Sequence, residues 1–146
     1  MSPRDVDEIA LVLRCHPIRV AGDSGPLKGE TTWAEIAKSA GLPEDYCELT
    51  TATRKPRRVG TFDPDLVKRA IDANSPTCIV LNHFDYVESG VRDNVYNVRA
   101  LDFLKMVETG IGQAADLIGT GPARFIKRSE IGVVSCSSYL KISVPS

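Results

Sequence analysis

The apolar run Thr77 to Leu81 is the feature that most limits how this chain can fold. It contains β-branched residues, shows no polar alternation, and is followed directly by Asn82-His83-Phe84-Asp85. A strand of this kind is typical of the centre of a parallel sheet, where both of its faces are covered. We therefore predict an α/β fold, a mostly parallel sheet with flanking helices. Polar residues at the carboxyl end of this strand are candidates for ligand contact.

Three segments predict helices. The first follows Thr32, which has capping-box spacing with Glu35, and it ends at Gly41. The second begins at Asp63-Pro64, with aspartate as the cap and proline at the first helical position. Asn97 caps the third. The predicted inward-facing residues of the second and third helices are Leu66, Val67, Ala70, Ile71, Val98, Leu101, Leu104, Val107 and Ile111.

The remaining segments predict a further strand, loops and a tail. Residues 8–15 form an apolar stretch, predicted as a largely buried strand that ends at His16-Pro17. Glycines and a proline indicate a loop over residues 21–29. Residues 48–53 are expected to be extended, and 54–58 to form a basic loop. We assign residues 1–126 to one domain and 127–146 to a tail without periodicity.

Composition excludes several classes of protein. The chain has 146 residues and a net charge of -1, so no overall field attracts nucleic acid or membranes. Its four cysteines form no C-x-x-C pair, which favours reduced thiols. No apolar stretch approaches the roughly 20 residues of a membrane span. The first residues resemble no targeting signal, and we expect a cytoplasmic protein.

Asp85 is a candidate for base recognition. A carboxylate at this position can accept hydrogen bonds from N1–H and the 2-amino group of guanine, whereas adenine lacks both donors. A site built on such a pair discriminates strongly, because the wrong base leaves polar groups unpaired. The N-x-x-D spacing is similar to the guanine-specificity loop of GTPases, with His83 in place of the lysine. An Asx turn that ends the strand is the alternative.

Residues 50–58, Thr-Thr-Ala-Thr-Arg-Lys-Pro-Arg-Arg, hold four cations and three hydroxyls. Arginine pairs bidentately with carboxylate or phosphate, so this loop suits a small dianionic substrate. A solvated basic loop is the alternative. The shortness of the cluster and the absence of interleaved aromatics argue against nucleic acid.

Two glycine-containing segments are weaker candidates. In Gly119-Thr120-Gly121-Pro122 the backbone can approach a ligand closely, although a tight turn has the same pattern. Residues 19–26 match either a binding segment or a flexible connection. The sequence predicts no catalytic triad, no phosphate-binding loop and no metal-ligand cluster, so we assign neither catalytic nor metal-ligating residues.

Together, the order and spacing of these four segments resemble the C-terminal part of adenylosuccinate synthetase. The family has an R-V-G-x-G-P-type segment, a T-T-G-R-x-R-R loop, a strand ending in T-K-L-D, and S-T-G-P near its terminus. The resemblance runs from about residue 5 to about residue 124. It implies the C-terminal part of a P-loop GTPase-like fold, and an enzyme that joins IMP to L-aspartate with GTP and magnesium.

The resemblance also implies roles for individual residues. Val20 would lie near the IMP ribose. The aspartate and IMP loop would contain Thr51, Ala52, Thr53, Arg54, Lys55 and Arg57, with Arg57 reaching towards GTP. The GTP base would contact His83, Phe84, Asp85, Gly119, Thr120 and Gly121. The family is homodimeric, so a homodimer is a candidate assembly.

Departures from the family pattern lead to two further expectations. The loop glycine is replaced by Arg54, which is expected to alter the loop path, and the lysine of T-K-L-D is replaced by His83. The family's phosphate loop, acid–base residues and Mg²⁺ contact have no counterpart in residues 1–146, so we expect the chain to be inactive alone. A non-enzymatic guanine-nucleotide-binding or regulatory module is the alternative.

Overall fold

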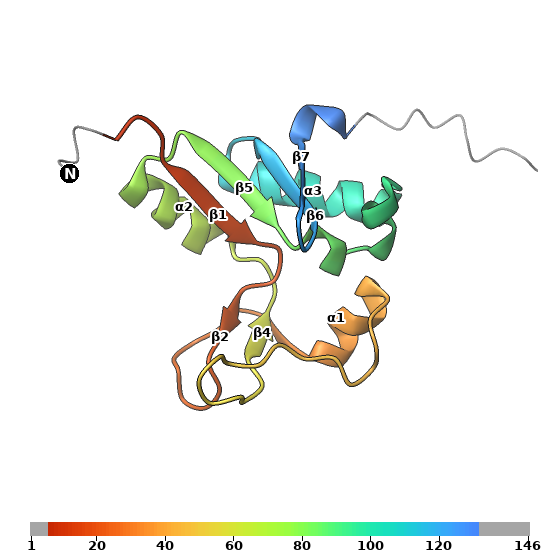
Figure 1. The fold of residues 1–146 in the computed structure, drawn as a ribbon. Coiled ribbons are helices and arrows are strands. Elements are labelled where there is room, and N and C mark those ends of the chain that lie inside the picture. Colours follow the sequence, from red (N-terminus) through yellow and green to blue (C-terminus); the bar gives the residue numbers. More distant parts are fainter. Residues whose placement is uncertain (1–5, 132–146) are drawn as a thin grey trace, which may run out of the picture.

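Residues 6–131, which the computed structural model describes, form a four-stranded sheet and a smaller three-stranded sheet (Figure 1). The larger sheet has the order β1 (Ala10–Arg14), β5 (Cys78–Asn82), β6 (Leu117–Gly121) and β7 (Arg124–Lys127). The first three strands are parallel to their neighbours, and β7 pairs with β6 in the antiparallel direction. The predicted mostly parallel α/β sheet is therefore confirmed, with the apolar run near residue 79 as an inner strand.

Helices α2 (Pro64–Asn74) and α3 (Val98–Ile111) cover one face of this sheet (Figure 1). Both predicted caps are present: the Asp63 carboxylate accepts from two backbone amides, and the Asn97 side chain accepts from one. The predicted inward-facing stripes are only partly confirmed. Leu66 is 50% exposed and Val98 is 71% exposed, and each lies in the first turn of its helix.

Strand β1 is less buried than predicted. It lies at the edge of the four-stranded sheet, and Val12 at its middle is 58% exposed. Leu13 and Cys15 point into the core on the helix side, whereas Val12 points to the opposite face. An apolar run shows that a strand can be buried, but its neighbours decide whether it is.

The smaller sheet was not predicted. Its strands β2 (Ile18–Arg19), β3 (Glu30–Thr31) and β4 (Arg58–Gly60) are two or three residues long and pair antiparallel in the order β2-β4-β3. Such short strands leave no periodic pattern in the sequence. Helix α1 (Trp33–Ala40) packs beside them, and the predicted capping box of Thr32 and Glu35 is present.

Three short 3-10 helices complete the described chain: η2 (Phe84–Tyr86), η3 (Ser89–Asp93) and η4 (Arg128–Glu130). The extended segment expected at 48–53 is reduced to one bridge between Leu49 and Pro56. The boundary predicted at residue 127 falls at the end of β7, and most of the expected tail lies outside the described residues. No helix within residues 6–131 has the length and apolar character to cross a membrane.

Candidate functional site

The carboxyl ends of β5 and β6 bring two of the predicted clusters together. Val80 and Leu81 pair with residues 117 and 118, so His83–Asp85, which follow β5, lie beside Gly119–Gly121 at the end of β6. The approach is closest at Gly119, where an added Cβ would lie 2.3 Å from the Asn82 side-chain oxygen. Glycine at this position therefore serves tight packing between neighbouring strand ends.

The Asp85 carboxylate is buried and already paired. Its side chain is 7% exposed, and its Oδ2 lies 3.0 Å from both Nε and Nη2 of Arg92. Arg92 also donates to the Ala40 carbonyl oxygen at 2.8 Å, and Arg124 donates to the Arg92 carbonyl oxygen at 2.7 Å. Asp85 therefore does not face open solvent, and a guanine base would have to replace or join Arg92.

Arg92 was missed by sequence reasoning, although its chemistry suits the position. A guanidinium presents adjacent N–H donors, and the N1–H and 2-amino group of guanine form a similar pair. Arg92 belongs to no motif and lies in a 3-10 helix seven residues after Asp85. Only the folding of η2 against η3 brings the two groups together.

The other predicted base-contacting residues differ in accessibility. Phe84 has no exposed surface and packs in the main core against Phe103, so its side chain is part of the core. Thr120 is fully buried, and its hydroxyl has no hydrogen-bond partner within residues 6–131. At Gly121 no atom lies within 4 Å of an added Cβ, so this backbone faces open space.

His83 lies between the four-stranded sheet and the smaller unit, by which we mean the three-stranded sheet, α1 and the loops that join them. Its backbone adopts a left-handed conformation with φ of 59°, and its ring centroid is 4.8 Å from that of Tyr86. Partial burial, followed by the nearby Arg14 charge, lowers the pKa of His83. A neutral imidazole at this position can accept one hydrogen bond and donate another.

The basic loop forms a tight turn built around Thr50. The Thr50 backbone N–H donates to the Lys55 carbonyl oxygen, and the Lys55 N–H donates to the Thr50 hydroxyl at 3.0 Å. Arg54 has φ of 54°, a left-handed conformation that favours glycine. Arg54 thus adopts a conformation that glycine would reach without strain. Residues 51–56 are exposed, and Arg57 is half-buried.

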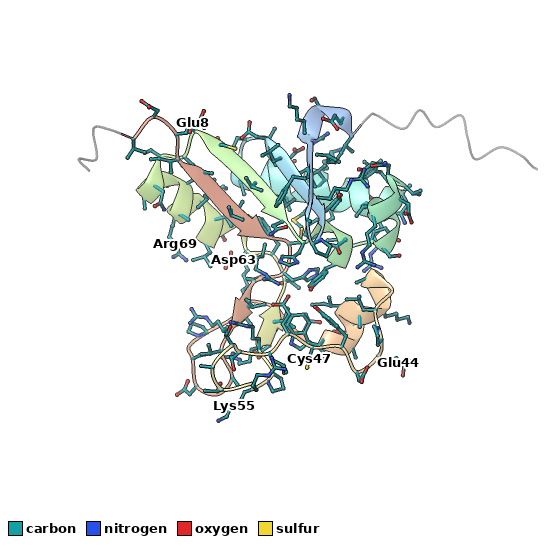
Figure 2. All side chains as sticks on the ribbon, viewed as in Figure 1. Glu8, Glu44, Cys47, Lys55, Asp63 and Arg69 are labelled. Carbon is teal, nitrogen blue, oxygen red and sulfur yellow. The ribbon has the colours of Figure 1, made fainter. Side chains whose placement is uncertain are left out.

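The basic loop, residues 51–57, and the predicted base-contacting residues, 83–85 and 119–121, belong to different parts of the molecule. Figure 2 shows Lys55 at the far end of the smaller unit, below the four-stranded sheet. Val20, which is 52% exposed, lies in the same unit directly after β2. No hydrogen bond or ion pair between described residues joins the 51–57 loop to residues 83–85 or 119–121. Residues 83–85 and 119–121 are therefore neighbours, whereas the 51–57 loop has no direct polar contact with either within residues 6–131.

Several side-chain contacts connect these parts, including a hydrogen bond from Arg99 on α3 to the Ser39 hydroxyl on α1. Arg14, at the end of β1, forms an ion pair with Glu48, which directly precedes the basic turn. The hydroxyls of Tyr46 and Tyr86 lie 2.6 Å apart, and burial raises the pKa of Tyr86. The junction is therefore polar, although aromatic rings surround it.

His16 also lies at this junction, and the sequence analysis did not predict this position. Its ring stacks on Phe103 with centroids 6.3 Å apart, and its Nδ1 is buried without a partner among the described residues. Burial, with further contributions from Arg14, Arg99 and His83, lowers the pKa of His16 to about 4. His16 is therefore neutral in the folded chain near pH 7.

No group of three metal-ligating side chains occurs within the part of the chain that the structure describes. The free thiols there are Cys15, Cys47 and Cys78, and burial raises the pKa of Cys15 and Cys78. These groups give no nucleophile activated by a neighbouring base.

Comparison with known proteins gives one consistent family. The sequence model of adenylosuccinate synthetase matches residues 1–95. The adenylosuccinate synthetase of Methanococcus maripaludis is 32% identical over 126 residues, which are 84% of this chain and 35% of the relative. That of Methanocaldococcus jannaschii is 33% identical over 126 residues, 84% of this chain and 34% of the relative. The chain thus spans about a third of the length of these relatives.

Solved structures have the same fold. The succinoaminodeoxyadenylate synthetase of cyanophage S-2L, bound to dGMP and to dATP as an energy donor, has a TM-score of 0.59 at 28% identity. The match covers 80% of this chain and 32% of that one. Fully ligated adenylosuccinate synthetase from Plasmodium falciparum has a TM-score of 0.68 at 16% identity, covering 88% and 41%. The chain described here belongs to the adenylosuccinate synthetase family.

Proposed function

We propose that this chain supplies the nucleotide-base and acid-binding loops of an adenylosuccinate-synthetase-type ligase. The observation that carries the proposal is the adjacency of His83–Asp85 and Gly119–Gly121 at the carboxyl ends of β5 and β6, in a member of this family. In such α/β sheets, that end of the strands is where ligands bind. The ligase reaction joins IMP to L-aspartate at the expense of GTP.

In that reaction the γ-phosphate of GTP is transferred to the purine 6-oxygen of IMP. The aspartate amine then forms the new C–N bond at C6, and phosphate leaves with the 6-oxygen. The residues of this chain would bind and orient the reactants. Arg54 and Lys55 project from an exposed turn, with Arg57 half-buried behind them, and so present cations to the aspartate carboxylates.

Mg²⁺ does not fit the described residues. They contain no cluster of three potential metal ligands, and their acidic groups at the junction are already engaged: Glu48 by Arg14 and Asp85 by Arg92. We assign no step of the reaction to a metal bound by this chain. A bound metal would have to be held by groups outside residues 6–131.

Because the chain spans about a third of its relatives, we propose that residues 1–146 alone give no turnover. The test is a coupled assay of adenylosuccinate formation with purified chain, GTP, IMP, aspartate and Mg²⁺. Sustained turnover by this polypeptide alone would refute the proposal. Isothermal titration calorimetry with GDP then distinguishes a chain that binds nucleotide without turnover from a chain that no longer binds nucleotide.

One observation favours a second candidate, a ligase whose energy donor is an adenine nucleotide. Arg92 is paired with the Asp85 carboxylate, the group that would select guanine, and the phage relative has dATP as its energy donor. Parallel titrations with GDP and ADP decide between the candidates. A guanine preference that Asp85→Ala abolishes supports GTP, whereas equal or stronger ADP binding supports the second candidate. GDP binding without turnover in any reconstituted mixture would favour a non-enzymatic regulatory module.

A further inference from the structure

The Asp85 carboxylate is covered by the side chain that binds it. Arg92 is the more exposed partner, with 32% of its side chain accessible against 7% for Asp85. Its Nε donates to Oδ2 of Asp85, and its Nη2 lies 3.0 Å from the same oxygen, whereas Oδ1 has no hydrogen bond with any described residue. A ligand that approaches Asp85 from solvent therefore meets the guanidinium before it meets Oδ2.

Arg92 is also anchored at places other than Asp85. Its Nη1 donates at 2.8 Å to the carbonyl oxygen of Ala40, the last residue of α1. A carbonyl at the C-terminal end of a helix carries partial negative charge and favours a cation. The Arg92 carbonyl oxygen accepts from Arg124, which donates at 2.6 Å to the Asn94 side chain as well. These contacts keep the guanidinium beside Asp85 whether or not a ligand is present.

Guanine and Arg92 would compete for one carboxylate oxygen. Recognition of guanine through Asp85 needs both oxygens, one for N1–H and one for the 2-amino group. With Oδ2 bound to the guanidinium, only Oδ1 is left for a base. The buried carboxylate is compensated by a full positive charge, so a neutral 2-amino group can replace Arg92 only at a cost in affinity.

From these contacts we propose that Arg92 is a specificity-determining residue of the nucleotide site. By occupying Oδ2 it removes selection for the 2-amino group of guanine, and the site then accepts purine nucleotides without discriminating at the 2-position of the base. This role rests on the proposed function, because it requires that a purine base binds at Asp85. A purely structural ion pair would not set the ratio of affinities for bases that differ only at the 2-position.

The test compares GDP with inosine diphosphate, which lacks only the 2-amino group. Isothermal titration calorimetry is carried out on the full chain and on Arg92→Met. We expect the parent chain to bind the two nucleotides with affinities within about threefold of each other. In Arg92→Met both oxygens of Asp85 are available, so GDP should bind about tenfold or more tightly than inosine diphosphate.

Three further variants show whether the change arises at Asp85. Arg99→Met, the matched control, removes another arginine contact to α1, the hydrogen bond to the Ser39 hydroxyl, and should leave the ratio unchanged. Arg92→Met/Asp85→Asn should restore the ratio of the parent, because an amide offers a single acceptor oxygen. Arg92→Lys keeps a cation beside Asp85 without the planar fork and should give an intermediate ratio.

Thermal melting identifies the variants that are folded, and Arg92→Lys carries the test if Arg92→Met is not. If the nucleotides bind but neither variant changes their ratio, or if the parent already prefers GDP tenfold, the role of Arg92 is refuted while the nucleotide site stands. If neither nucleotide binds the parent or any folded variant, the proposed nucleotide site is itself wrong, and the role of Arg92 is refuted with it.

Discussion

The two sheets of this molecule are held together by different forces. The four-stranded sheet packs against α2 and α3 around fifteen buried apolar residues, which include Leu81, Phe84 and Leu104. The cluster beside the three-stranded sheet contains only four, Ile36, Ala40, Val59 and Tyr86. Burial of apolar surface thus stabilises the first unit strongly and the second weakly.

The smaller unit depends instead on polar contacts. Arg58 pairs with Glu30 through two hydrogen bonds of 2.7 Å and donates to the Gly25 carbonyl oxygen at 2.9 Å. These contacts hold the 20–29 loop near β4. The loops predicted to bind IMP and aspartate lie on this unit, whereas the base-side groups lie on the apolar one. Segments held by few buried apolar contacts unfold locally more readily, so we expect local motion mainly in the loops predicted to bind IMP and aspartate.

The largest effect should come from a cavity in the four-stranded unit. Leu104→Ala removes a side chain that is 1% exposed, and it should lower the free energy of unfolding by about 3 kcal/mol. Val98→Ala on the same helix, at an exposed position, is the control and should change it by less than about 0.5 kcal/mol. Urea denaturation measures both. Similar costs for the two variants would show that burial of Leu104 does not stabilise the four-stranded sheet and its helices.

The next effect concerns the pair of Asp85 and Arg92, whose guanidinium also donates to the Ala40 carbonyl oxygen of α1. Arg92→Met leaves the Asp85 carboxylate buried without its partner and should cost about 2 kcal/mol in unfolding free energy. The double variant Arg92→Met/Asp85→Asn should recover at least half of that loss, because no uncompensated charge remains. Urea denaturation of the parent, the two single variants Arg92→Met and Asp85→Asn, and the double variant completes the double-mutant cycle. A single variant as stable as the parent would show that the pair does not hold the junction.

The pH dependence of stability tests the same junction through His16. Its pKa is about 4 in the fold and 6.5 in a free histidine, so the unfolded chain binds a proton first as the pH falls. The contribution is complete above about pH 6.5 and is lost as the pH falls towards 4, amounting to about 2 kcal/mol after allowance for partial exposure. His16→Phe should flatten this part of the stability curve. An unchanged slope between pH 6.5 and 4 would contradict burial of a neutral ring.

The smallest effect should be confined to the smaller unit. Thr32→Ala removes the N-cap of α1 and should cost about 1 kcal/mol locally, because one backbone amide loses its acceptor. Amide hydrogen exchange should speed up in α1 while α3 is unchanged. Lys38→Ala, on the same helix, is the matched control. Faster exchange throughout both sheets would show that the two units unfold as one.

Local signals predicted most of the elements. The caps at Thr32, Asp63 and Asn97 fixed where three helices begin, since each cap satisfies backbone donors of its own first turn. The unbroken apolar run likewise identified β5. The strand pair β2 and β3 could not be predicted, because two-residue strands gain their order from β4 and not from their own sequence.

The candidate site shows the same division. Sequence order placed His83–Asp85 and Gly119–Gly121 at strand ends, and parallel register then made them neighbours. The basic loop was recognised from composition, but its separation from the base-side groups was not. The pairing of Asp85 with Arg92 depends on how η2 folds against η3, for which residues 84–93 have no periodic signal.

The sequence by itself determined the helix starts, the inner strand and the family, because these depend on residues that are close along the chain or on motifs in a fixed order. Only the tertiary structure decided that β1 is an edge strand of the sheet formed by residues 6–131, that Phe84 is a core residue, and that Asp85 is bound to Arg92. The physical reason is that burial and charge pairing depend on which surfaces meet, and a residue's own neighbours in sequence do not specify those surfaces.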